Sequence, residues 1–144
     1  MTDAVAQARI INEVANKKEL AQFKEKDDRY KYELYKLTIK EIFKILEGNQ
    51  EGSVALDEID LKDLQDYKKG LQEIESGFYA LYSGGKVTGR GLEPKTIQPM
   101  IDQAGTKLTM AAKFKAKGEE EECLNKLKEG RLLLFHLVEH LDAV

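Results

Sequence analysis

The only two prolines of this chain, Pro94 and Pro99, lie within six residues of each other. Proline lacks a backbone donor and interrupts helix interiors and central strands, so the rest of the 144-residue chain can form long regular elements. Lys, Glu, Leu, Ala and Gln, which favour helices, fill most of the sequence between the glycine clusters. Alternating runs rich in β-branched residues are absent from the sequence, so we predict an all-α protein.

Apolar residues recur with helical spacing in four helical regions. These regions run from about Asp3 to Glu47, from Asp57 or Asp60 to Tyr82, from about Thr96 to Gly118, and from Glu119 to Asp142. The second has the clearest period, with steps of three and four residues through Leu64, Tyr67, Leu71, Ile74, Phe78 and Leu81. We predict a single domain over residues 1–144, folded as an antiparallel helical bundle or an irregular stack of helical hairpins.

The first region is too long to be one straight helix inside such a domain. A continuous helix would extend about 65 Å, more than the width of a domain of this size. Either the helix breaks near Asp27 and Asp28, or an N-terminal segment over residues 3–24 projects and packs on a partner. The sequence leaves both alternatives open.

Glycine and proline mark the connections. Residues 83–94 carry four glycines and are predicted to form a flexible linker, after which Pro99 falls in the first turn of the third helix. Gly70 and Gly77 lie beside the apolar seam of the second region. Each costs about 1 kcal/mol relative to alanine, which indicates close approach of a neighbouring helix rather than of a ligand.

Charge and composition exclude several classes of protein. Twenty-six acidic and 23 basic residues give a net charge of -3, which disfavours nucleic-acid binding through a basic face. No apolar run approaches the ~20 residues that cross a bilayer, and Met1 to Ile10 does not resemble a signal peptide. We therefore expect no membrane partner and a cytoplasmic, reduced protein in which the single cysteine, Cys123, is a packing residue.

One short motif suggests metal chemistry. His136 to His140 read H-x-x-E-H, the order that resembles the inverted zinc peptidases, where two histidines bind zinc and the glutamate activates water. Such peptidases need a further downstream ligand, but this chain stops four residues later. The two histidines also fall opposite the apolar stripe of their helix. We therefore interpret them as part of a solvated face, with an adventitious or regulatory metal site as the alternative.

Two carboxylate pairs suggest an enzymatic alternative. Glu119 and Glu122, followed after sixteen residues by Glu139 and Asp142, resemble the E-x-x-E and E-x-x-D pattern of all-α nucleoside triphosphate pyrophosphohydrolases. The resemblance implies four carboxylates that hold magnesium against a triphosphate. The pairs must then lie on facing helices, which requires Gly130 to break the fourth region into a hairpin.

A third pattern has the spacing of a helical hairpin. Residues 104–137 resemble one tetratricopeptide-type unit through Met110, Ala111, Phe114, Gly118, Cys123, Leu127 and Gly130, although Lys107 and Phe135 depart from that pattern. The resemblance implies two antiparallel helices with Gly118 at the turn and Gly130 at a close contact. Similar spacing suits other small interaction bundles. The glycines and Lys86 of the linker lack the order of a phosphate-binding loop.

Taken together, these patterns favour a non-enzymatic helical module that binds a protein partner or a second copy of itself, such as an adaptor, a small chaperone or an assembly subunit. We expect no cofactor. Two groups of aromatic residues are the candidate contacts, and tyrosine is enriched at binding hot spots. The alternative is that these rings only cover the core of the bundle. The two groups comprise Tyr30, Tyr32, Tyr35, Phe78, Tyr79 and Tyr82.

Overall fold

The computed structural model describes residues 7–48, 58–85 and 93–142, and these residues are almost entirely helical. The described elements are α2 (Arg9–Ala15), the 3-10 helix η1 (Lys18–Phe23), α3 (Asp27–Glu47), α4 (Leu61–Ser83), α5 (Pro94–Ala116) and α6 (Glu120–Asp142). The prediction of an all-α protein is confirmed. The starts proposed at Asp3 and Asp57 lie outside the described residues.

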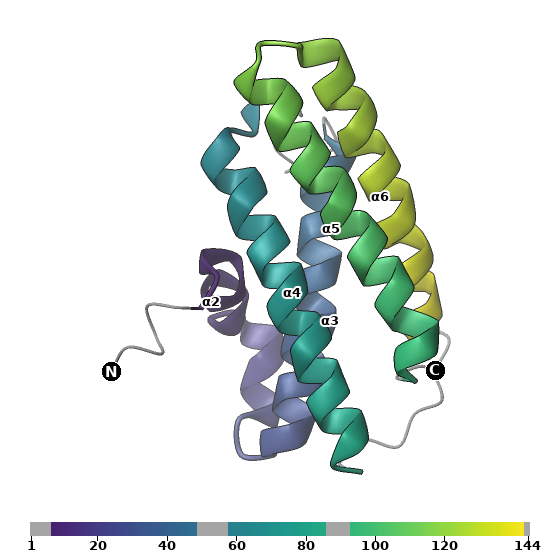
Figure 1. Ribbon diagram of the computed structural model, residues 1–144. Helices are drawn as coiled ribbons and strands as arrows, with labels where there is room; N and C mark the ends of the chain where they lie inside the picture. Colours follow the sequence, from purple (N-terminus) through teal and green to yellow (C-terminus); the bar gives the residue numbers. More distant parts are fainter. Residues whose placement is uncertain (1–6, 49–57, 86–92, 143–144) are drawn as a thin grey trace.

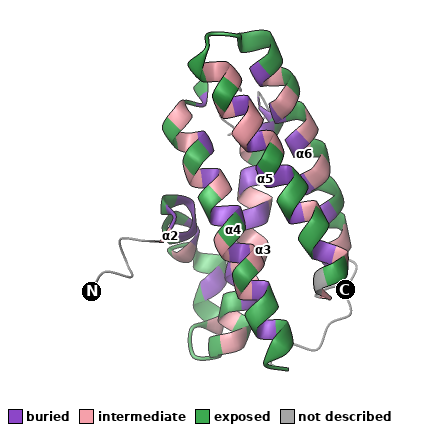
Figure 2. Ribbon diagram, viewed as in Figure 1, coloured by how far each residue is buried: buried purple, intermediate pink, exposed green. Residues whose placement is uncertain are grey.

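The four long helices form an antiparallel bundle. Each of α3, α4, α5 and α6 runs opposite to its neighbour in sequence, and α6 returns to pack on α3 (Figure 1). The buried residues line the interior that these helices share (Figure 2). Every residue of the seam predicted for α4 is at most 6% exposed. Regular spacing of apolar residues therefore gave the correct buried face of this helix.

The N-terminal region breaks and folds back onto the bundle. A turn at Lys24 to Lys26 separates η1 from α3, so a break lies directly before Asp27, where the sequence predicted one near Asp27 and Asp28. Ile11, Val14 and Leu20 are each 1% exposed, and α2 packs on both α3 and α4. From residue 7 onward, the segment covers the chain's own core rather than projecting from it.

Carboxylates of α4 hold the start of α2 in place. The residue before α2, Ala8, has no side chain that can cap the helix. The backbone amides of Arg9 and Ile10 instead donate to the two oxygens of Asp66 at 2.7 and 2.9 Å, and the Ala8 amide donates to Glu73 at 2.9 Å. A helix N-terminus has unpaired amides and a positive dipole, so these contacts stabilise the fold-back.

Local signals explain where the long helices begin and end. The Asp60 side chain accepts from the Asp63 amide while Asp63 accepts from the Asp60 amide, which forms a capping box at the start of α4. Gly48 follows α3 and Gly118 lies between α5 and α6; both have positive φ, which glycine adopts without strain. Gly118 is therefore the predicted turn of the final hairpin.

The prediction for the third helix was wrong at its start. The helix begins at Pro94, two residues earlier than predicted, so Pro99 lies in its second turn and not its first. Proline has no amide hydrogen, and the Lys95 carbonyl therefore lacks its usual helical donor. The helices also shorten the predicted linker, because Ser83 ends α4 and Pro94 begins α5. Residues 86–92 of that linker lie outside the described residues.

The two glycines of α4 mark close contacts, as the sequence predicted. A methyl group at Gly77 would lie 2.6 Å from the Tyr35 hydroxyl oxygen and still closer to the ring, while one at Gly70 would lie 3.0 Å from Ile10. Tyr35 belongs to α3 and Ile10 to α2. Side chains of neighbouring helices, and not a ligand, therefore occupy the space beside both glycines.

Candidate functional site

The predicted aromatic contacts divide between the core and the surface. Phe78 is fully buried and Tyr32 is 6% exposed, while the Tyr35 ring meets Phe78 edge-on with centroids 5.6 Å apart. Tyr30 is half-buried and packs on the same core. These four rings form part of the bundle interior or its margin. Tyr79 and Tyr82, which are 59% and 42% exposed, stay available at the end of α4.

The histidine pair lies on the outer face of α6. The His136 side chain is 59% exposed, with its Nδ1 atom 3.9 Å from a carboxylate oxygen of Glu139, and His140 is half-buried. Within the described ranges, no group of three or more His, Cys, Asp or Glu residues is placed to hold a metal ion. The zinc hypothesis therefore has no third ligand among these residues.

The two carboxylate pairs are not brought together. Helix α6 runs without interruption through Gly130, and Glu122 and Glu139 lie about 26 Å apart along it at 1.5 Å per residue. Gly130 instead sits against α5, where a methyl group would lie 3.4 Å from Lys107 Cβ. The pyrophosphohydrolase hypothesis requires the two pairs on facing helices, but Glu122, Glu139 and Asp142 belong to α6 and Glu119 lies directly before it.

Cys123 is a poor candidate for a nucleophile. Its side chain is buried, and burial raises the pKa of its thiol. A thiol with a raised pKa forms little thiolate at neutral pH, and the thiolate is the reactive species. Cys123 therefore has the environment of the packing residue predicted from the sequence.

A groove runs between α4 and α5. Two adjoining hollows of about 390 and 340 Å³ share Lys68, Thr109 and Lys113. The groove exists because α5 presents small residues at helical spacing toward α4, which leave the space between the helix backbones unfilled. These small residues are Gly105, Thr109, Ala112 and Ala116.

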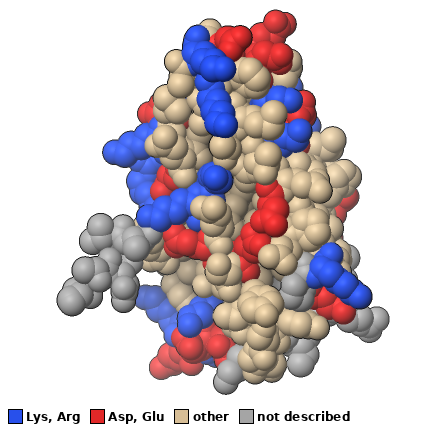
Figure 3. Space-filling view, viewed as in Figure 1, with Lys and Arg blue, Asp and Glu red and all other residues tan. Residues whose placement is uncertain are grey.

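Charged side chains lie along this groove in two groups. Glu75 and Asp102 line one hollow, and the lysines Lys68 and Lys113 line both. Partial burial, and secondly the carboxyl group of Asp102, raise the pKa of Glu75 above its ordinary value. Figure 3 shows this side of the molecule, where uncharged surface runs between the blue and red groups.

A second apolar surface covers the opposite side, where α6 meets α3. Leu132 is 50% exposed and Phe135 is 37% exposed, and the Phe135 ring lies 5.9 Å from that of Phe43 on α3. Sequence reasoning missed this surface. A helical wheel could have found it, because Leu132 and Phe135 fall on the same outer side of α6 as His136.

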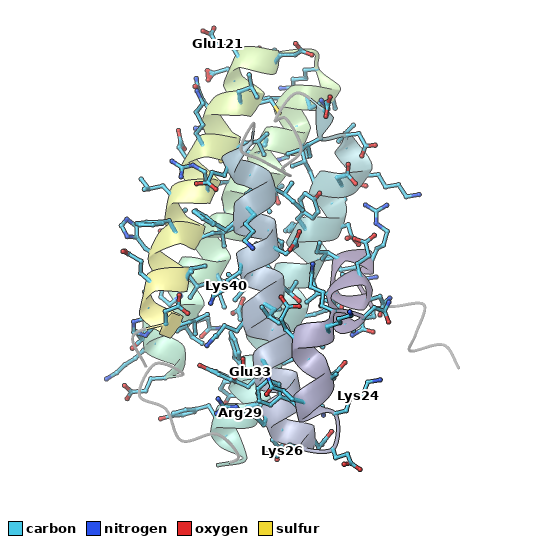
Figure 4. The ribbon with its side chains drawn as sticks, turned by 180° about the vertical axis from the view of Figure 1, so that it is seen from behind. Lys24, Lys26, Arg29, Glu33, Lys40 and Glu121 are labelled. Carbon is cyan, nitrogen blue, oxygen red and sulfur yellow. The ribbon has the colours of Figure 1, made fainter. Side chains whose placement is uncertain are left out.

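Ion pairs border this second surface. Lys40 of α3 reaches Asp142 at 2.9 Å, and Figure 4 shows Lys40 on α3, which stands beside the yellow α6 in that view. Glu121, at the start of α6, lies at the far end of the bundle from Arg29, near the start of α3 (Figure 4). Lys107 of α5 pairs with Glu129 at 2.8 Å on the other flank of α6.

Comparisons with known proteins return no match to a family model, a curated protein or a solved structure. Among the helices that the structure describes, none has the length and apolar character needed to span a membrane. The tetratricopeptide resemblance of residues 104–137 stays a prediction. Its hairpin turn at Gly118 and its close contact at Gly130 agree with the α5–α6 pair, but any helical hairpin could show the same features.

Proposed function

We propose that this chain is a non-enzymatic protein–protein interaction module whose α4–α5 groove binds an amphipathic helix of a partner protein. The observation that carries the proposal is the groove itself, in which small and apolar side chains lie among charged and polar ones. Its lining runs on α4 from Leu61 to Glu75, about 21 Å of helix. A long, open groove suits a rod-shaped segment better than a compact small molecule, which usually binds in an enclosed pocket.

The charges of the groove define the partner further. Lys68 and Glu75 are seven residues apart on α4, about 10 Å along the axis. A helix lying in the groove would then carry an acidic and a basic residue about seven positions apart, beside an apolar stripe at positions i, i+3 and i+4. Small apolar residues on that stripe would fit the space above Gly105 and Ala112.

A displayed library of amphipathic helical peptides tests this proposal. Selected peptides should bind the wild-type chain and lose at least tenfold in affinity for Gly105→Leu, whose side chain would fill the groove. A methyl group at Gly105 meets only Lys68 Cγ, at 3.9 Å, so the larger residue can enter the groove without disturbing the core. Circular dichroism would check that the variant remains helical.

The matched control is Tyr79→Ser, which changes a side chain that is exposed but lies outside the groove. Peptides that bind the groove should retain their affinity for this variant. Selected peptides that bind Gly105→Leu as tightly as the wild type would contradict the proposal.

A further inference from the structure

The outer face of α6 is an unpartnered apolar surface with an ordered set of charges. Lys128, Leu132, Phe135, His136 and Glu139 fall within one third of the helix circumference at 100° per residue. Leu132 and Phe135 are large and exposed, and Phe43 supports Phe135 from α3. Leu132 and Phe135 are three positions apart and are therefore neighbours on the helix surface, where they can contact another molecule together.

The charges on this face are symmetric about the apolar pair. Lys128 lies before the apolar pair and Glu139 lies after it. Both are the same number of sequence positions from the midpoint between Leu133 and Leu134. Leu132 and Phe135 are likewise equally far from that midpoint. Lys128 has no ion-pair partner within residues 7–48, 58–85 and 93–142, and the Glu139 side chain is 60% exposed. The Lys128 side chain is thus available to a second molecule, and Glu139 keeps most of its surface exposed although its carboxylate lies 3.9 Å from His136 Nδ1 of its own helix.

We propose that this face is the interface of a homodimer, in which α6 of one copy packs antiparallel against α6 of a second copy. A twofold axis would pass beside the midpoint between Leu133 and Leu134, so that each contact occurs twice. In that register Leu132 meets Phe135 of the second copy, and Lys128 meets Glu139 of the second copy. Arg131 lies opposite His136 of the second copy in the same register.

The physical argument is self-complementarity. A surface that carries a cation on one side of an apolar centre and an anion on the other matches its own copy only when that copy is reversed. Parallel packing would instead place Lys128 against Lys128 and Glu139 against Glu139. The second copy therefore accounts for both the exposed apolar pair and the order of the charges. This interface lies on α6 and is independent of the α4–α5 groove.

Charge exchange tests the register directly. Lys128→Glu places two acidic pairs across the axis, and Glu139→Lys places two basic pairs there. Each single variant should weaken dimerisation about tenfold, because the substitution changes both copies of the pair. An equal mixture of the two variants should form heterodimers, since every pair in the mixed dimer is again of opposite charge. Sedimentation equilibrium, with one of the two chains carrying a fluorescent label, measures the association of each single variant alone and of their mixture.

Two further measurements control the interpretation. The double variant Lys128→Glu, Glu139→Lys should dimerise like the wild type, whereas Leu132→Asp should be monomeric with an unchanged helical circular dichroism spectrum. Tyr79→Ser, which alters the other exposed aromatic site, should leave the dimer unchanged. A wild-type chain that stays monomeric up to about 1 mM overturns the proposal. So does a mixture of the two single variants that associates no better than either alone.

Discussion

Two glycines, Gly77 in α4 and Gly105 in α5, allow a matched test of how closely these helices pack. Both lie in helix interiors, where alanine is favoured over glycine by about 1 kcal/mol. Their surroundings differ. A methyl group at Gly105 meets only Lys68 Cγ at 3.9 Å, whereas one at Gly77 overlaps the ring of Tyr35.

The structure predicts opposite effects of the same substitution. Gly105→Ala should raise the free energy of unfolding by about 1 kcal/mol, because the methyl group fits without displacing another atom. Gly77→Ala should gain the same helix propensity but must displace the Tyr35 ring, which packs edge-on against Phe78. Overpacking of this kind costs about 1–3 kcal/mol, so the two variants should differ by about 2 kcal/mol.

Urea unfolding followed by far-UV circular dichroism measures both free energies, provided that unfolding is two-state. The variant Tyr35→Ala supplies the control. It removes the ring, so Gly77→Ala in that background should regain the stabilisation of about 1 kcal/mol. If Gly77→Ala stabilises the otherwise unchanged chain as much as Gly105→Ala does, the close packing of α3 on α4 at this point is refuted.

Three other substitutions test separate features of the fold. Asp66→Ala removes the carboxylate that accepts from the Arg9 and Ile10 amides. The variant should lower the free energy of unfolding by about 1–2 kcal/mol and speed amide hydrogen exchange in residues 9–23. Unchanged hydrogen exchange in those residues would contradict the capping role of Asp66. Asp60→Ala should cost about 1 kcal/mol through loss of the capping box of α4, and an unchanged urea midpoint would argue against it. Glu75→Gln should raise the melting temperature at pH 7. The pKa of Glu75 is raised in the folded chain, so the folded state binds the proton more tightly and loses stability as pH rises above the ordinary value of 4.5. The gain should vanish at about pH 3.5, where the carboxyl is protonated in both states, and an equal gain at both pH values would refute this account.

The candidate surfaces were only partly predictable from the sequence. Aromatic residues near helix faces suggested partner contacts, but Phe78 and Tyr32 turn inward and belong to the core. Leu132 and Phe135 point outward although their residue types favour burial. Residue type gives the preference for burial, but the position of a neighbouring helix decides whether a given side chain is covered. The α4–α5 groove has the same origin, because it depends on small residues of one helix facing a second helix.

The sequence by itself determined the elements of this protein. These elements depend on helical periodicity, on acidic caps and on the positive-φ glycine at Gly118. Each of these features acts over a few residues, so neighbouring residues in the sequence are sufficient to specify it. Only the tertiary structure decided where the N-terminal segment goes. The amides at the start of α2 find their acceptors on Asp66 and Glu73, 57 and 65 residues further along the chain. Such contacts form only when the bundle brings α4 beside α2, so no local pattern could reveal them.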